Sequence, residues 1–479
     1  MHVRWLLAAF AIAATLVAAQ LATKRADTLQ PDELTYLSIV QDLQRNGMFT
    51  NGEMVSESER RQPGRFFAPA YPGLLHGLAT LDPALADAIA CHLAERERVR
   101  GACGSLVSLL ILQVVLAGVG LAAVFAIALT LSGSLPVAWM TMLIALASGV
   151  LSDYARLFLT ENIAFPAFLV ALACLVALFA DSTAGNGSDG STRLWQAIAA
   201  GAALGIAVLA RPSFLYLAYA CAIVLALLAL WPGQRRARIG WAHAGLFALA
   251  CLGALLPWLV RNYSQFGDMT LTTGYAPFTL AQRVAYNAMT WQEWWAAWIF
   301  WFPDIGDDLA KALLPPEATA RLGFNEPETF YKTGVGPVFS DTLAAAGDPR
   351  HHLSYIMKTH VVGDLGKHVA VTFPLAWRGM WPGKWIAVAG VLLLLPAIIL
   401  QRRSGRLVPF LALAAPLFFM LGLHAFASVN VVRYNAPMIA LYAFAIAICI
   451  AQLVPHWRAG GVHATTHAPP GAGKPPGRG

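Results

Sequence analysis

Long, uninterrupted apolar segments are the feature that most limits what this chain can fold into. The first, WLLAAFAIAATLVAAQLAT at residues 5–23, contains no charged side chain. Apolar runs of about 18 or more residues can cross a hydrocarbon core roughly 30 Å thick. Because lipid offers the backbone no hydrogen-bond partners, only helices or closed barrels cross it, and these runs are too long for barrel strands. The sequence therefore predicts an all-α polytopic membrane protein.

Composition supports the same class. Hydrophobic residues make up 58% of the 479 residues and charged residues only 12%, whereas about a quarter of a soluble domain is charged. The formal charge of +7 comes from basic residues that flank the apolar segments, as is typical of membrane topology control. No basic run interleaved with aromatic residues indicates a nucleic-acid surface. We therefore expect the lipid bilayer as a partner and no nucleic acid.

We interpret ten segments as membrane spans and expect about 10–13 transmembrane helices in total. The higher number allows for residues 287–303 and 365–381, which are apolar enough to lie in or on the membrane. Residues 73–91 are more interrupted and fit a helix along the interface. The ten spans are 5–23, 105–131, 135–151, 162–180, 194–210, 212–231, 241–260, 384–400, 407–427 and 435–454. The break at Arg211-Pro212 is compatible with either a turn or a kink.

Basic residues in the short loops orient these spans. GQRRARIG at 233–240 and QRRSGR at 401–406 are strongly basic, and such loops stay in the cytoplasm. Both termini are then cytoplasmic, and the long loops 24–104 and 261–383 face outward. A cleaved signal peptide at the amino end would leave the first of these loops outside as well.

The same pattern divides the chain into four regions. Residues 1–262 form an amino-terminal transmembrane module whose outer loop, 24–104, carries an acid pair. Residues 263–383 form the second outer loop, and 384–455 hold the last transmembrane helices. Residues 456–479 are rich in Gly and Pro, and we expect this tail to be disordered in the cytoplasm.

Two of the six cysteines, Cys91 and Cys103, fall in the first outer loop. On an oxidising side of the membrane they can pair and close a short loop, which contributes roughly 3 kcal/mol in the chain-entropy model. A pair of free thiols remains the alternative. The other four cysteines lie within spans and read as small apolar fillers.

Ionisable residues from separate spans gather at the predicted outer face. Arginine offers a planar fork that matches phosphate oxygens, and a carboxylate opposite it can act as a general base. Each residue alone also has a simpler interpretation, since an arginine at a span end often anchors the helix and an acid pair is often merely solvated. The candidates are Asp32, Glu33, Glu161, Arg211, Arg261, Asn262, Arg433 and Tyr434.

Several short motifs then match a known pattern in order and sidedness. They are DELTYLSI, APAYPGLL, TEN, RPSFLY, PWLVRNYSQFG and RYNAP, spread over residues 1 to about 455. With these motifs the chain resembles the GT-C superfamily of integral-membrane glycosyltransferases. The resemblance is to the branch that contains protein O-mannosyltransferases and aminoarabinose transferases.

The resemblance implies an inverting transfer of a hexosyl or pentosyl group from a polyprenyl-phosphate carrier to a glycan, lipid or protein acceptor. It makes Asp32 the catalytic base, with Glu33 beside it. It assigns Arg261 and Arg433, then Arg211, to the departing phosphate. It implies a bacterial inner-membrane enzyme whose active site faces the periplasm. The remaining substrate-binding candidates are Tyr36, Tyr71, Glu161, Asn262 and Tyr434.

Cofactor and competing functions complete the expectations. No metal site is predicted, because adjacent acids on a loop do not form a complete cage, although they leave room for a single divalent cation. A flippase or transporter for lipid-linked glycans is the first alternative, although the chain lacks the matching halves that transporters often show. A polymerase or ligase of O-antigen type, which would use the same carrier phosphate, is the second.

Overall fold

Helices dominate the secondary structure of the residues that the structure describes. The structure, a computed structural model, describes residues 2–23, 28–52, 62–100, 102–183, 190–231, 239–348 and 351–454. Strand pairing in these ranges is limited to one bridge between Thr28 and Val99. The predicted tail at 456–479 and most of the basic loop at 233–240 lie outside the described residues. The predicted all-α class is confirmed.

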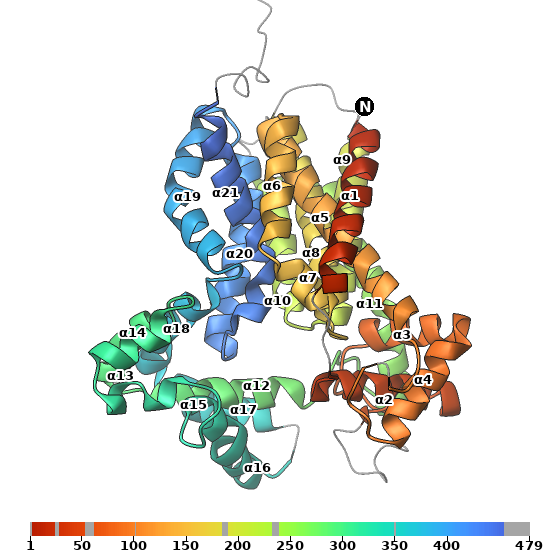
Figure 1. Cartoon of the computed structure of the whole chain (residues 1–479), viewed down its shortest axis with the longest axis vertical. Coiled ribbons are helices and arrows are strands. Elements are labelled where there is room, and N and C mark those ends of the chain that lie inside the picture. The colour runs from red at the N-terminus through yellow and green to blue at the C-terminus, as the bar shows by residue number, and fades with distance from the viewer. Residues whose placement is uncertain are drawn as a thin grey trace, which may run out of the picture.

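Long apolar helices form a bundle that occupies the upper part of Figure 1. Within the described ranges, eight helices are long and apolar enough to cross a membrane. The other two predicted spans form the shorter apolar helices α6 and α10. The bundle contains α1 (His2–Thr23), α5 (Val107–Ser132), α6 (Leu135–Ala147), α8 (Glu161–Thr183), α9 (Gly190–Ala210), α10 (Phe214–Leu230), α11 (Trp241–Phe266), α19 (Trp385–Arg403), α20 (Leu407–Ala427) and α21 (Ile439–Ala451).

Two glycines let α9 and α11 pack backbone to backbone. A Cβ atom at Gly201 would lie 2.2 Å from the Phe247 carbonyl oxygen, and one at Gly205 would lie 2.9 Å from that of Cys251. The four-residue spacing puts both glycines on one face of α9, as in the small-xxx-small contacts of membrane helices. This contact fixes the position of the end of α9, where Arg211 follows.

Three breaks in the helices differ in detail from the sequence prediction. The predicted span 135–151 ends at Ala147, because Gly149 adopts a left-handed φ of 72° before the short α7 (Val150–Ala155). The predicted interfacial helix at 73–91 is two helices, because the Asp82 side chain caps a new helix by accepting from the amides of Ala84 and Leu85. The open question at Arg211-Pro212 is resolved as a turn between α9 and α10.

Shorter helices from the two long loops collect at one end of the bundle, as the topology prediction requires (Figure 1). The first loop supplies α2 (Pro31–Asn46), α3 (Ala70–Leu81) and α4 (Pro83–Ala94). Neither 287–303 nor 365–381 qualifies as an additional span among the described helices. The second loop supplies α12 (Tyr275–Val284), η3 (Ala285–Ala288), α13 (Trp291–Phe300), α14 (Gly306–Leu313), η4 (Pro316–Ala318), η5 (Ala320–Leu322), α15 (Phe330–Thr333), η6 (Gly334–Val338), α16 (Phe339–Ala346), α17 (His352–Ile356), η8 (Met357–Val362) and α18 (Leu365–Gly379).

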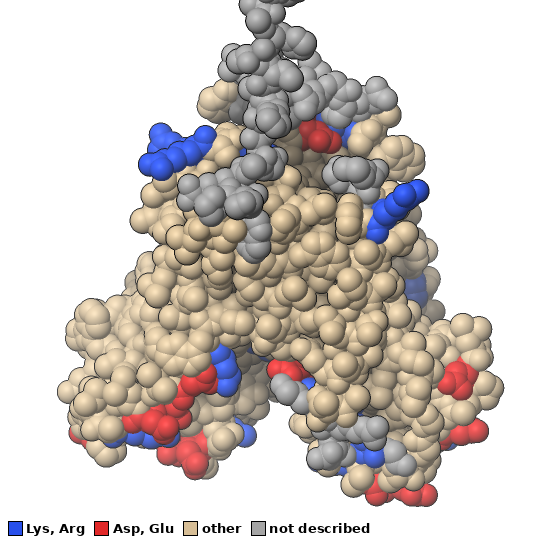
Figure 2. Space-filling model, turned by 45° about the horizontal axis from the view of Figure 1, so that its top comes forward, with Lys and Arg blue, Asp and Glu red and all other residues tan. Residues whose placement is uncertain are grey.

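The two groups of outer helices form separate lobes with a hollow between them (Figure 2). Acidic and basic atoms are visible at the top of this hollow, beneath the bundle (Figure 2). The loops that connect the lobes also touch, since Arg65 Nη1 lies 2.5 Å from Asp268 Oδ1. The fold therefore places polar chemistry where the bundle meets the two lobes.

Candidate active site

Three residues from distant parts of the sequence form an ion-pair cluster at the end of the bundle that carries the lobes. Glu161 is the first residue of α8, Arg211 lies between α9 and α10, and Arg433 lies in the 3-10 helix η9 (Val432–Met438). Arg211 Nη1 donates a hydrogen bond of 2.9 Å to Glu161 Oε1. Arg433 Nε lies 3.1 Å from the same oxygen. The Glu161 side chain is only 3% exposed, so the two guanidinium groups compensate a buried carboxylate.

Asp32 approaches this cluster from the first outer lobe. It lies in the first turn of α2, and its Oδ2 atom is 4.0 Å from Arg433 Nη2. The Asp32 side chain is 63% exposed and that of Arg433 is 36% exposed. Arg433 therefore faces a buried carboxylate on one side and an accessible one on the other. We call Asp32, Glu161, Arg211 and Arg433 the Glu161 cluster.

Buried amides hold the segment that carries Arg433. Asn430 is fully buried with a left-handed φ of 47°, a conformation that Asn tolerates better than most residues. Its Nδ2 atom donates to the Leu375 carbonyl at 2.7 Å, and its Oδ1 accepts from Asn435 Nδ2 at 2.6 Å. A Cβ atom at Gly379 would lie 2.5 Å from either amide nitrogen. Only glycine therefore allows α18 to approach the 430–435 segment this closely.

Aromatic side chains surround the cluster. The Arg211 guanidinium lies 4.6 Å from the centre of the Tyr434 ring, within the range of a cation–π contact. Burial and the charge of Glu161 raise the pKa of Tyr36 above its ordinary value. The sequence interpretation missed Tyr275 at the start of α12, where burial and the neighbouring Tyr434 raise its pKa. No local motif marked Tyr275, because only the fold brings the second outer loop to this point.

Glu33 lies next to Asp32 in sequence but has a different environment. It is fully buried and forms an ion pair with Arg100. Its Oε1 also accepts from the Phe158 amide at 2.6 Å, and its Oε2 accepts from the Gln30 amide at 2.6 Å. Both oxygens are thus engaged at the start of α2, and Glu33 lies in a separate buried network outside the Glu161 cluster.

Arg261 and Asn262 lie at the end of α11 and make a different set of contacts from Arg433. Arg261 donates to the backbone carbonyls of Gly64 and Phe49 at 2.8 and 3.1 Å. Its guanidinium also lies 4.7 Å from the centre of the Trp258 ring. Asn262 is fully buried and donates to the Thr270 carbonyl at 2.7 Å. These two residues tie the loops to α11, and phosphate binding by Arg261 stays a prediction.

Tyr71, the other aromatic candidate, is part of the core. Its side chain is fully buried, and its hydroxyl accepts a hydrogen bond of 2.8 Å from Gln113 Nε2. It supports Tyr36 through an edge-to-face contact with a centroid distance of 5.6 Å. Tyr71 therefore positions Tyr36 and is not exposed to a substrate.

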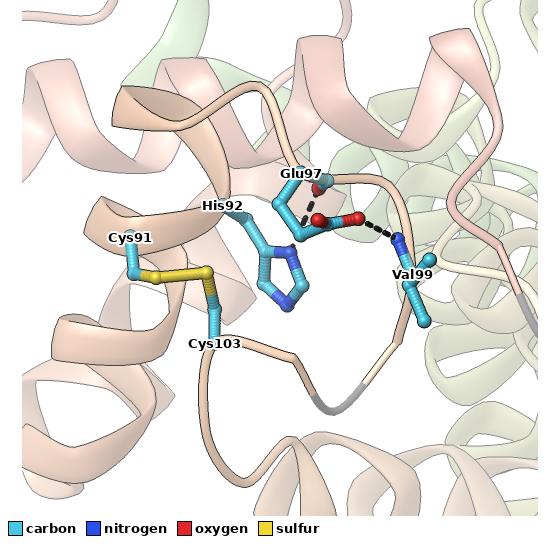
Figure 3. Close-up of a disulfide and its surroundings, with 5 residues drawn as sticks. All are labelled: Cys91, His92, Glu97, Val99 and Cys103. Atoms are coloured by element: carbon cyan, nitrogen blue, oxygen red, sulfur yellow. Dashed lines mark hydrogen bonds between the residues drawn. A yellow bond between two sulfur atoms is a disulfide. The ribbon is translucent and has the colours of Figure 1, made fainter.

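Cys91 and Cys103 are joined in a disulfide, with Cα atoms 5.5 Å apart (Figure 3). The two cysteines and Glu95 are also the close-lying group of potential metal ligands found among the described residues. Two of those three ligand atoms are bonded to each other. The acids of the Glu161 cluster each face an arginine. Among the described residues no further group of this kind is found, and the single divalent cation that the sequence leaves room for stays an expectation.

Comparison with known proteins gives structural similarities but no sequence match. No protein-family model matches the sequence, and no curated protein matches it. The oligosaccharyltransferase AglB from Archaeoglobus fulgidus, solved with an inhibitory peptide and a dolichol-phosphate, superposes with a TM-score of 0.50 at 14% identity, covering 95% of this chain and 51% of that one. ArnT from Cupriavidus metallidurans, bound to undecaprenyl phosphate, gives a TM-score of 0.36 at 15% identity over 94% of this chain and 79% of that one.

The likeness to AglB concerns the fold, because the sequence identity is low. The chain spans about half the length of AglB. The long apolar helices agree with the all-α membrane class that the sequence predicted. This chain therefore shares its overall helical fold with the oligosaccharyltransferase AglB.

Proposed function

We propose that this protein transfers a hexosyl or pentosyl group from a polyprenyl-phosphate carrier to a hydroxyl of a glycan, lipid or protein. The carrying observation is the position of Arg433, with Nη2 4.0 Å from Asp32 and Nε 3.1 Å from Glu161. One guanidinium group thus borders both an accessible carboxylate and a buried one. This arrangement supplies a phosphate-binding cation and a proton acceptor at one open site.

In the proposed reaction the acceptor hydroxyl attacks the anomeric carbon while Asp32 takes its proton. The bond between that carbon and the phosphate oxygen breaks, and its electron pair leaves with the phosphate. Arg433 and Arg211 stabilise the negative charge that develops on the phosphate, because fixed donors stabilise charge best in a partly desolvated site. Attack from the face opposite the phosphate inverts the anomeric configuration. Glu161 holds the two arginines in place between turnovers.

The distribution of basic residues supports an active site on the outer side. Arg402 and Arg403 lie in the last turn of α19, and Arg4 lies near the start of α1. Both helix ends are at the end of the bundle away from the lobes (Figure 1). Since basic residues mark the cytoplasmic side, the lobes and Asp32 face the periplasm of a bacterial inner membrane in this proposal.

The test is transfer by Asp32→Asn in membranes supplied with undecaprenyl-phosphate-linked hexoses and pentoses. We expect kcat to fall by roughly 10³-fold, as for loss of a general base, while the protein still binds undecaprenyl phosphate. Asp87→Asn is the matched control, because Asp87 is an exposed acid on α4 in the same lobe. Full transfer by Asp32→Asn would refute the assigned base. Carrier movement across the membrane with no sugar transferred would identify a flippase instead.

A further inference from the structure

The ion pair between Glu33 and Arg100 joins the two sides of the proposed active site. On one side, Glu33 follows Asp32 directly and caps α2 through the Gln30 amide. On the other, Glu33 Oε1 accepts from the Phe158 amide, and Arg100 Nη1 donates to the Arg156 carbonyl at 2.5 Å. Phe158 lies three residues before Glu161 in the sequence. Asp32 and Glu161 are thus anchored to the same buried pair.

The loop that supplies Arg100 is held closed at both ends. The disulfide joins residues 91 and 103, and inside it the buried His92 ring bonds the Glu97 carbonyl at 2.9 Å (Figure 3). The Glu97 carboxylate accepts from the Val99 amide at 2.6 Å (Figure 3). Leu29, which lies outside the loop, donates from its backbone amide to the carbonyl of Arg98 within the loop at 2.7 Å. Arg100 therefore extends from a small closed loop that also contacts the chain just before α2.

We propose that Arg100 is a positioning residue that holds Asp32 and Glu161 at their working separation, and that the Cys91–Cys103 disulfide keeps Arg100 in place. This inference rests on the proposed function, since it concerns the geometry of that reaction. The Arg100 side chain is 12% exposed and Glu33 is fully buried, so the pair is shielded from solvent. The Arg100 guanidinium also lies 4.2 Å from the centre of the Phe158 ring. This contact further limits the movement of the Arg100 side chain.

The expected consequence is a loss of rate rather than a loss of donor binding. The proposed phosphate contacts come from Arg211 and Arg433, which Arg100 does not touch in the contacts described above. Reacting groups misplaced by about 1 Å can cost about 100-fold in rate. We therefore expect Arg100→Gln to lower kcat by about 100-fold and to change the Kd for undecaprenyl phosphate by less than about twofold.

Two variants separate positioning from general stability. Arg98→Gln is the matched control, because Arg98 is an exposed arginine in the same loop, and we expect wild-type kcat. The double variant Glu33→Gln/Arg100→Gln removes both charges, so no buried carboxylate is left unpaired. We expect its unfolding temperature to recover relative to Arg100→Gln while its kcat stays low. Recovery of both quantities, or an equal loss of kcat and donor binding in Arg100→Gln, would overturn the proposal.

A readout that does not need transfer keeps this inference distinguishable from the proposed function. The Phe158 amide donates a hydrogen bond to Glu33. Hydrogen exchange of the backbone amides at residues 156–162 and 31–35 therefore reports directly on the contacts of the Glu33–Arg100 pair. We expect faster exchange in both segments of Arg100→Gln. If the wild-type protein transfers no sugar but exchange becomes faster in both segments of Arg100→Gln, the proposed function fails and the positioning role of Arg100 stands. If neither segment responds, the positioning role fails.

The disulfide has its own test in the full-length protein. We expect Cys91→Ser/Cys103→Ser to lower kcat by about tenfold, a smaller effect than Arg100→Gln because the arginine can still reach Glu33 for part of the time. A reductant should lower wild-type kcat to the same level and leave the double serine variant unchanged. That variant controls for the free cysteines Cys174, Cys221, Cys251 and Cys449. Unchanged kcat in the double serine variant would remove the disulfide from the proposal.

Discussion

Arg433 and Arg261 both lie at the outer end of a membrane helix, yet their surroundings differ in kind. Arg433 is paired with the carboxylate of Glu161 and faces the accessible Asp32. Arg261 donates to two backbone carbonyls and to Asn262 Oδ1, and it packs on Trp258. Under the proposed function, a phosphate binds Arg433 beside the exposed Asp32. At Arg261 it would have to displace the loop contacts that hold the structure together.

The hydrogen-bond partners of an arginine at a helix end indicate whether it fixes a loop or is available to bind a ligand. An arginine that satisfies backbone carbonyls fixes a loop, because leaving those acceptors buried and unpaired is costly. An arginine held by one buried carboxylate, with part of its surface open, retains donors for a ligand. The following predictions test this contrast, in decreasing order of expected effect.

Glu161→Gln should have the largest effect on the free energy of unfolding. Removing the carboxylate leaves Arg211 and Arg433 without their buried partner, at a cost of about 3 kcal/mol. Thermal unfolding in detergent measures the loss. Added undecaprenyl phosphate should raise the unfolding temperature of this variant more than that of the wild type, because phosphate replaces the missing negative charge. An equal shift in both proteins would contradict phosphate binding at the cluster.

Arg433→Ala should weaken the binding of undecaprenyl phosphate by about 30-fold, since a charge-assisted hydrogen bond contributes about 2 kcal/mol. Arg433→Lys should retain part of the affinity, because lysine keeps the charge and loses the planar fork. Equilibrium binding in detergent measures both variants. Unchanged affinity in Arg433→Ala would remove this arginine from the donor site.

Arg261→Ala should lower stability while leaving donor affinity unchanged. The carbonyls of Gly64 and Phe49 lose their donor, at about 1 kcal/mol each, and the unfolding temperature in detergent reports the change. The comparison with Arg433→Ala is matched, because both variants remove one arginine from the outer end of a membrane helix. A loss of donor affinity as large as that of Arg433→Ala would support the original prediction for Arg261.

Asp268→Asn should have the smallest effect on stability, and the effect should be measurable as a change in pH dependence at acidic pH. Hydrogen bonds from Arg65 and Thr270 lower its pKa from 3.8 to about 2. The folded-state pKa is therefore below the unfolded one. The stabilisation is fully present above pH 3.8 and is lost as the pH falls through about 2. We expect the wild-type unfolding temperature to fall more steeply over this window than that of Asp268→Asn. Parallel curves would show that the Arg65 contact adds no stability.

Much of the architecture followed from sequence because the bilayer imposes simple length and polarity rules. All ten predicted spans correspond to apolar helices, and the two long loops collect at one end. Helix ends were less predictable where a single residue decided them. Asp82 starts a new helix inside an apolar run. Asp followed by Pro83 is typical of a helix start, but the apolar run led us to expect one interrupted helix there.

The candidate site was predictable only in part. Asp32, Glu161, Arg211 and Arg433 share one cluster, and each is among the ionisable residues that the sequence places at one membrane face. Glu33 and Arg261 did not join it, although each lies in a motif that carried the family resemblance. Adjacent residues at a helix start point in different directions, so Asp32 is exposed beside Arg433 while Glu33 is fully buried. A linear motif does not record that divergence.

The sequence by itself determined that this is an all-α membrane protein with charge gathered at one end, because hydrophobic length and basic loops act locally along the chain. The tertiary structure alone decided which charges meet. Residues 32, 161, 211 and 433 come together because α8, the α9–α10 turn, η9 and the first lobe pack at one point. Close contacts at Gly201 and Gly379, where a Cβ atom would not fit, set that packing.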